Sequence, residues 1–485
     1  LKKINGMFSF SIWNRQSKSL YLARDRFGEK PLYYSWIPQN SSFVFGSDLI
    51  FDKLFTNVNF DINPLALNDL FHLNYIDNNY TIFKNIKKID PGTFVEVNFK
   101  KYQTPQIFRK KYWDLDRSHI YSNSYTNYGD AKRDLNSILT NVVQNQILAD
   151  VEVGTFLSGG IDSSLITAKA QELSSRRIKT FCIGNENQEY DESNYAKKVS
   201  KHLGTDHEEI ILNDKIMIDK VPHIINKLNE PLGDSSFIPS YFVSELARSK
   251  VKVVLTGDAG DELFGGYNRY TQIDNLRKIH LIPKFLKKII KKNFYNINDK
   301  NIFKISKIIS LLPFFKKQFY LNNKINKILD RIDPDLNYDE FILNFLINKI
   351  PYNVFVEPKN FSKAIIFKNF QSKNNLKFSL PQKIINIDLK SYLPNDILFK
   401  VDRASMANSV ETRAPFLDLD LFYFSQSIPM NYKIKNSDGK IILRDLLKEK
   451  VPKNLVDRPK AGFSIPIGEW VRKPLLDWSE NLLSK

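Results

Sequence analysis

Cysteine is almost absent from this sequence: Cys182 is the one cysteine among 485 residues. A single thiol excludes an internal disulfide and a metal site built from several cysteines. No apolar run approaches the roughly 20 residues that a membrane-spanning helix needs, and no secretory signal is recognisable. We therefore expect a cytoplasmic protein without a membrane partner. We place Cys182 in the core, because the surrounding run 178–183 is apolar.

Acidic side chains are also in the minority, since 53 Asp and Glu stand against 71 Lys and Arg, a formal net charge of +18. A basic excess can indicate nucleic-acid binding. Here the excess is mostly lysine mixed with asparagine and isoleucine, and it is densest in 284–327 and 363–377. We interpret it as compositional drift and expect no nucleic-acid partner. The lysine-rich stretch 268–385 is predicted to be mostly helical, as a surface or packing insert.

The most informative stretch runs from Phe156 to Ser164 and reads FLSGGIDSS. An apolar, β-branched run, 151–157, precedes it, and helical spacing follows it, so the glycines lie at a strand-to-helix turn. Such a turn lets the backbone approach an oligophosphate, with free N–H groups at the helix N-terminus facing the anion. The serine hydroxyls add donors, and the carboxylate of Asp162 suits a bridging Mg²⁺. A solvent-exposed loop is the alternative, but the ordered motif after a buried strand favours phosphate.

Strands and helices alternate in the middle of the chain. The predicted strands are 151–157, 179–183, 207–212 and 251–256, and a helix is predicted from Tyr128. Strands separated by helices indicate a parallel, doubly wound sheet, in which ligands bind at the carboxyl ends of the strands.

A second glycine-flanked loop follows the last of these strands. It contains three carboxylates within five residues: Asp258, Asp261 and Glu262. Such carboxylates repel each other unless a cation or a polar substrate is present. A solvated acidic turn is the alternative, but together with the first loop this one indicates the second half of a Mg·ATP site.

The chain on either side of this region is less specific. Residues 5–45 predict antiparallel strands, and 62–78 a helix with Leu65 and Phe71 on its apolar side. Residues 398–418 suit a buried helix with interspersed charges, for which Asp402 with Arg403 and Glu411 with Arg413 are candidate structural pairs. Lys460 is a natural point charge for pyrophosphate, although by sequence it is one lysine among many.

These motifs together resemble those of the glutamine-hydrolysing asparagine synthetases. The resemblance is carried, in family order, by 5–8, 23–34, 158–164, 256–267, 400–418 and 458–463. It implies an α/β protein of two parts. Residues 1–114 would be the C-terminal part of a type 2 glutamine amidotransferase domain, a truncated N-terminal nucleophile fold of the αββα type. Residues 115–485 would be an ATP pyrophosphatase-type synthetase domain, a doubly wound parallel sheet with a helical C-terminal part.

The resemblance also implies the activity and its residues. ATP would adenylate the side-chain carboxylate of L-aspartate, and ammonia from glutamine, passing through an internal channel, would displace AMP to form asparagine. Asp258 and Lys460 would be catalytic, and Asp162 and Asp261 would hold Mg²⁺. The ATP-binding residues would be Leu157, Ser158, Gly159, Gly160, Asp162, Ser163, Ser164, Ile183, Thr256 and Gly257.

Two departures from the family pattern qualify this expectation. The chain starts at Leu1, and the family's nucleophilic cysteine is missing, so the sequence is interpreted as a fragment that should not itself hydrolyse glutamine. The segment 231–236 has serines where well-known relatives have an arginine for the aspartate α-carboxylate. A different carboxylate acceptor, such as a uronic acid, is therefore an open alternative.

Two readings outside the family remain for comparison. An RNA-modifying ATP pyrophosphatase would need a sulfur-handling cysteine or an RNA-binding module, and neither is evident. A non-catalytic remnant would have lost the loop carboxylates, all of which are present. The oligomeric state stays open, a homodimer being one option.

Overall fold

The computed structural model describes residues 1–485 except 56–57, 59, 78–79, 100–103, 116–123, 187–190, 274–279, 286, 289–336, 349–377, 457–464 and 485. Most of the lysine-rich stretch 268–385 and the segment containing Lys460 therefore lie outside the described residues. Within the described part of the chain, no helix combines the length and apolar character needed to cross a bilayer.

Two antiparallel sheets lie within the first 111 residues. One has the strand order β1-β2-β6-β7 and the other β4-β3-β5. Buried and half-buried side chains alternate along β6, in which Val95 and Val97 are fully buried between half-buried neighbours. The bounds are β1 Ser9–Asn14, β2 Ser19–Arg24, β3 Tyr33–Ile37, β4 Ser42–Gly46, β5 Lys87–Lys88, β6 Thr93–Asn98 and β7 Gln106–Lys111.

A parallel five-stranded sheet forms the centre of the molecule, as the alternation of strands and helices predicted. Its order is β10-β9-β8-β11-β12, and every pair is parallel. The chain runs outward from β8 through β9 to β10 and then returns to the other side of β8 for β11. The bounds are β8 Val153–Phe156, β9 Lys179–Asn185, β10 Asp206–Leu212, β11 Val253–Leu255 and β12 Glu411–Arg413. Where the strand order reverses, the loops after β8 and β11 diverge and leave a crevice.

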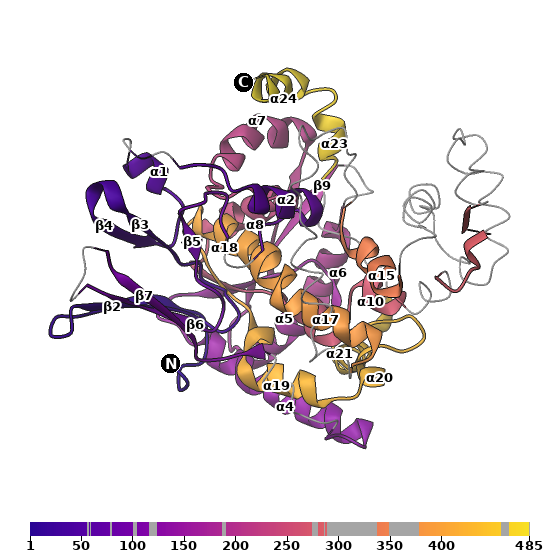
Figure 1. The fold of residues 1–485 in the computed structure, drawn as a ribbon. Helices are drawn as coiled ribbons and strands as arrows, with labels where there is room; N and C mark the ends of the chain where they lie inside the picture. Colours follow the sequence, from indigo (N-terminus) through magenta and orange to yellow (C-terminus); the bar gives the residue numbers. More distant parts are fainter. Residues whose placement is uncertain are drawn as a thin grey trace.

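Helices cover both faces of this sheet. Val253 and Leu255 of β11 belong to one apolar cluster, which includes Leu135 of helix α4 (Tyr128–Ile147). Val254 between them belongs to another cluster, with Phe242 of helix α8 (Phe237–Arg248). Because successive side chains of a strand point to opposite faces, the two clusters lie on opposite sides of the sheet. In Figure 1 the antiparallel strands, in indigo, lie to the left of this body, and helix α18 (Leu398–Met406) runs beside them.

The helices have the following bounds: α1 Phe51–Leu54, α2 Pro64–Leu73, α4 Tyr128–Ile147, α5 Ile161–Leu173, α6 Ser193–Leu203, α7 Asp214–Ile225, α8 Phe237–Arg248, α9 Gly260–Phe264, α10 Asn268–Thr271, α15 Tyr338–Leu346, α17 Leu380–Lys390, α18 Leu398–Met406, α19 Leu419–Ser427, α20 Met430–Lys433, α21 Ile441–Leu447, α22 Lys453–Val456, α23 Ile467–Trp470 and α24 Leu476–Leu483. Short 3₁₀-helices are η1 Pro38–Asn40 and η6 Pro415–Leu417, and η5 Leu393–Ile397 is a π-helix.

The sequence predicted a helix over 398–418, but the structure divides this segment into a helix and a strand. Helix α18 ends at Met406, whose side chain is 50% exposed, and the chain then forms the edge strand β12. Both predicted charge pairs are present. Arg403 Nη2 lies 2.7 Å from Asp402 Oδ2, and Arg413 Nε lies 2.7 Å from Glu411 Oε1.

Helix α2 buries a different face from the one that its apolar residues predicted. Leu65 and Phe71 are each 39% exposed, whereas Ala66, Asp69 and Leu73 are buried. On this buried face, burial together with the charge of Asp77 raises the pKa of Asp69 to about 7. Tertiary contacts override the apolar pattern of this short helix.

Candidate active site

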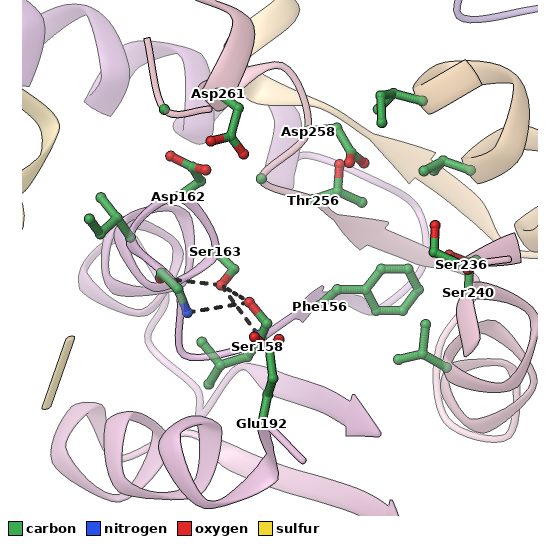
Figure 2. Close-up of a pocket in the computed structure, with 18 of the residues that line it drawn as sticks. Phe156, Ser158, Asp162, Ser163, Glu192, Ser236, Ser240, Thr256, Asp258 and Asp261 are labelled. Atoms are coloured by element: carbon green, nitrogen blue, oxygen red, sulfur yellow. Dashed lines mark hydrogen bonds between the residues drawn. The ribbon is translucent and has the colours of Figure 1, made fainter. Parts of the chain in front are cut away.

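The crevice beside β8 holds a cavity of about 530 Å³. Its walls come from the loops after β8 and β11, from β9, from helices α8 and α18, and from the turn before α21. Of the residues predicted from the sequence, Leu157, Ser158, Gly160, Asp162, Ser163, Ile183, Thr256, Gly257, Asp258 and Asp261 line it. Two loops more than 90 residues apart in the chain thus face one space, as the parallel-sheet argument required (Figure 2).

The loop after β8 presents donors at the N-terminus of α5. Gly159 has φ +73°, and an added Cβ would lie 2.7 Å from the backbone of Tyr195, so only glycine fits there. The hydroxyl groups of Ser158 and Ser163 are 3.0 Å apart, and the N–H of Gly160 donates to Ser158 Oγ at 3.3 Å. The structure does not bring Gly159 or Ser164 to the cavity wall, and Ser164 is fully buried. The positive end of a 13-residue helix and the polar groups around it can hold an anion.

Two predicted metal ligands lie close together in the cavity wall. Asp162 on α5 and Asp261 on α9 point toward one another in Figure 2. They approach closely because Gly260 has no side chain: a Cβ there would lie 2.6 Å from Asp162 Cγ. Ala259 has φ +69°, a conformation that costs a non-glycine residue on the order of 1 kcal/mol. This turn brings the acidic loop to the cavity.

Lys440 lies between these two carboxylates, and the sequence reasoning missed it. Its Nζ forms an ion pair with Asp162 Oδ2 and lies 2.7 Å from Asp261 Oδ1. The lysine is only 7% exposed. Burial acts to lower its pKa, but the charges of Asp162 and Asp261 outweigh burial and raise the pKa. The available signal was local, since Lys440 follows an Asp-Gly turn and precedes the apolar helix α21.

A second lysine, Lys400 on α18, lies at another part of the same cavity. Its Nζ is 2.7 Å from Asp234 Oδ2 and donates to Ser236 Oγ at 2.8 Å. Burial opposes the ionisation of Asp234, but Lys400 outweighs it and lowers the pKa of Asp234 to about 2. Asp234 belongs to the segment 231–236. From the sequence we note the serines of this segment and assign no role to its acid.

Asp258 lies beside Thr256 on the loop after β11 (Figure 2). Burial raises the pKa of the Asp258 carboxyl, while the Thr256 hydroxyl and the charge of Lys400 oppose the shift. This acid and Lys400 therefore act on the same region of the cavity.

Apolar side chains line the remaining wall: Phe156, Leu157, Phe181, Cys182, Ile183 and Val243. Cys182 is a free thiol, 4% exposed, whose pKa is raised by burial, so the prediction of a core cysteine holds. A flat apolar ligand group fits this wall better than a charged one.

A metal site made of protein side chains alone is not present in the described part of the chain, where no group of three or more His, Cys, Asp or Glu is suitably clustered. Lys460 lies outside the described residues.

The fold and cavity define an α/β protein with a polar, lysine-containing cavity at the reversal of its strand order. The profile of the asparagine synthase family matches residues 134–485, and that of a glutamine amidotransferase domain matches residues 1–113. The chain belongs to the asparagine synthase family.

Three curated relatives cover essentially the whole chain. Asparagine synthetase [glutamine-hydrolyzing] 1 of Bacillus subtilis (strain 168) is 30% identical over 499 residues, which span 100% of this chain and 71% of that protein. A putative asparagine synthetase [glutamine-hydrolyzing] of Mycobacterium tuberculosis (strain ATCC 25618 / H37Rv) is 30% identical over 489 residues, 99% of this chain and 70% of that protein. Amidase chry2 of Gibberella zeae (strain ATCC MYA-4620 / CBS 123657 / FGSC 9075 / NRRL 31084 / PH-1) is 23% identical over 520 residues, 100% and 73% respectively.

Proposed function

We propose that this protein is a glutamine-dependent asparagine synthase, EC 6.3.5.4. It would amidate L-aspartate through a β-aspartyl-AMP intermediate and release AMP and pyrophosphate. The proposal divides the chain into residues 1–114, of the N-terminal nucleophile type, and residues 115–485, the synthetase. It includes a cytoplasmic location, small-molecule substrates only, and a homodimer as one assembly. The observation that carries it is Lys440 held between Asp162 and Asp261 beside the N-terminus of α5.

In the first step, a carboxylate oxygen of the acceptor attacks the α-phosphorus of ATP, and the bond to pyrophosphate breaks. The N–H groups and hydroxyls of the α5 loop would hold the phosphates, and the ammonium of Lys440 would face the departing pyrophosphate. Two carboxylates next to a phosphate site are a donor set that suits Mg²⁺, which usually binds through one or two carboxylates plus substrate phosphates. Asp162 and Asp261 would hold the ion, which when bound neutralises charge on the phosphates. Lys460 keeps its predicted role at the same phosphates.

In the second step, ammonia attacks the acyl carbon, and AMP leaves. We assign Asp258 to this step, because its carboxylate can take the proton that the attacking nitrogen loses. A void of about 20 Å³ lies next to it, lined by Glu29 and Lys30 of the N-terminal part and by Thr256 and Asp258 of the synthetase part. Such a void accommodates about one water-sized molecule. This supports the passage of ammonia between the two parts.

A different acceptor acid is the second candidate. No arginine lies in the segment 231–236, and its acid Asp234 is already paired with Lys400. The relatives named amidases fit a wider range of acceptors. The chemistry would be unchanged, with another carboxylate in the place of aspartate.

The test is pyrophosphate release from Mg·ATP with ammonium as nitrogen donor, with and without L-aspartate. Supplying ammonium makes the readout depend on the synthetase site alone. Aspartate-dependent release together with asparagine formation supports the proposal. Release with another acid but not with aspartate favours the second candidate. Absence of release with every acid, from a folded protein, contradicts both.

A further inference from the structure

A second cavity of about 380 Å³ lies beside the first, and Asp234 and Tyr392 line both. Its volume falls within the range of about 300–1,000 Å³ that is typical of small-molecule sites. The wall combines His72 and Asn74, from the end of α2, with residues of the synthetase part. The remaining described lining residues are Leu73, Tyr75, Gly233, Ser235, Arg269, Leu346, Asn348, Asp388 and Asp396. Neither the proposed adenylation nor the ammonia step uses this space.

The π-helix η5 connects the two cavities. Tyr392 directly precedes it, Asp396 lines the second cavity, and Ile397 lines the first. π-Helical turns are rare and are frequently found at functional sites. Here two consecutive residues of the π-helical turn line different cavities, Asp396 the second and Ile397 the first.

Asp396 is a buried polar side chain in the wall of the second cavity. It is 3% exposed, and its Oδ1 has no hydrogen-bond partner among the described residues. Burial raises the pKa of Asp396 well above its usual range, Lys400 opposes this, and a hydrogen bond with Asp234 raises it further. One carboxyl oxygen of Asp396 is thus bonded to Asp234, and the other, Oδ1, can accept a hydrogen bond from a ligand.

The cation of this wall is already engaged. Arg269 Nη2 lies 2.8 Å from Asp388 Oδ2, and its guanidinium lies over the rings of Tyr267 and Tyr392, 4.8 and 4.5 Å from their centroids. Asn348 Nδ2 donates to Asn74 Oδ1 at 3.0 Å. His72 Nδ1 lies 2.9 Å from the Asn68 carbonyl oxygen, to which it donates when neutral, leaving Nε2 as an acceptor. The described lining contains three acids, Asp234, Asp388 and Asp396, and its arginine is paired with one of them, so a ligand carboxylate would meet acidic side chains.

We infer that the second cavity binds the part of the acceptor that lies away from its reacting carboxylate, and that this part carries hydrogen-bond donors, either hydroxyls or an ammonium group. The inference rests on the proposed function. It assigns the first cavity to ATP and the reacting carboxylate, and the second to recognition of the acceptor.

The main test blocks the second cavity at its rim. Asn348 is exposed and its backbone N–H bonds to the His72 carbonyl, so Asn348→Trp fills the opening and keeps that bond. Asn145 is also exposed, on α4, and Asn145→Trp serves as the matched control. Pyrophosphate release is measured with ammonium and with L-aspartate or D-glucuronate as acceptor. We expect Asn348→Trp to raise the KM of the active acceptor at least about tenfold, with the KM of ATP and the melting temperature unchanged.

The two donor types are separated by Asp396→Asn. The amide still donates to Asp234 and still offers an oxygen, but it cannot become negatively charged. A hydroxyl-bearing acceptor such as D-glucuronate then keeps its KM, whereas an ammonium-bearing acceptor such as L-aspartate shows an increased KM. An unchanged acceptor KM in Asn348→Trp overturns the inference and leaves the proposed function intact. No pyrophosphate release from the wild-type protein with any acid overturns the proposed function, and the inference with it.

Discussion

Two buried lysines, each between carboxyl groups, stabilise different parts of the same cavity. At Lys440, two carboxyl groups from separate helices, Asp162 and Asp261, share one ammonium. Near Lys400, the pKa values of two neighbouring acids shift in opposite directions. Burial opposes ionisation of Asp234, but Lys400 outweighs it and lowers the pKa to about 2, whereas burial raises the pKa of Asp396 well above its usual range. The Lys440 cluster, in which two acids share one ammonium, is therefore suited to receive a further cation with phosphates. The Lys400 cluster joins one acid with a lowered pKa to another with a raised pKa, and it suits fixed recognition.

Lys440→Met should have the largest effect, because it leaves two buried carboxyl groups without their shared ammonium. We expect pyrophosphate release to fall at least about 100-fold and the free energy of unfolding to fall by about 3–5 kcal/mol. Urea unfolding and a pyrophosphate assay measure both. Lys440→Arg, which keeps the charge, should recover most of the stability. A Lys440→Met protein with normal turnover would remove this residue from the proposed chemistry.

Lys400→Met should destabilise the protein by about 3 kcal/mol, since it leaves Asp234 buried and ionised. The double variant Lys400→Met/Asp234→Asn should lose less than the sum of the two single variants, as measured by urea unfolding in a double-mutant cycle. Additive losses would mean that the two residues do not stabilise each other.

Asp234→Asn should change the pH dependence of stability. The pKa of Asp234 is lowered in the folded protein to about 2 from the model-peptide value of 3.8. Its contribution is therefore present above the unfolded pKa and is lost as pH falls toward the folded one. The shift corresponds to about 2 kcal/mol. Wild type and variant should differ by this amount near neutral pH and converge toward pH 2 in thermal unfolding; a constant difference across this range would contradict the assignment.

Asp162→Asn should weaken Mg²⁺ binding, because an amide oxygen is a poorer ligand for this ion than a carboxylate. The Mg²⁺ concentration for half-maximal pyrophosphate release should rise at least about tenfold. Asp396→Asn, in the other acid cluster, is the control and should leave the Mg²⁺ dependence in place. Equal Mg²⁺ curves for wild type and Asp162→Asn would place the ion elsewhere.

Cys182→Ser should have the smallest effect. The thiol is buried and donates to the Ile183 carbonyl oxygen at 3.4 Å, a bond that a serine hydroxyl can replace. We expect a loss of about 1 kcal/mol in unfolding free energy and ammonium-dependent activity within about threefold of wild type. Loss of all activity in a folded variant would show that the thiol does more than pack.

The sequence predicted the features that depend on neighbours in the chain. The alternation of strands and helices gave a parallel sheet, because side-chain periodicity and turn residues are local properties. The strand-to-helix loop at Ser158 and the acidic loop at Asp258 face one cavity, since carboxyl ends of parallel strands share an edge. The pairs Asp402–Arg403 and Glu411–Arg413 formed between residues one or two positions apart.

The tertiary structure alone decided which distant residues complete the site. Lys440 meets Asp162 across 278 positions, and Lys400 meets Asp234 across 166. Lys440 follows an Asp-Gly turn, but among 71 basic residues this local feature does not show which carboxylates the lysine meets. The buried face of α2 and the second cavity likewise depend on packing between parts of the chain that are distant in sequence. By itself, then, the sequence determined the sheet and its two ligand loops through local periodicity and turn chemistry, whereas folding decided the cations and acceptor wall, because burial and charge pairing arise only when remote segments meet.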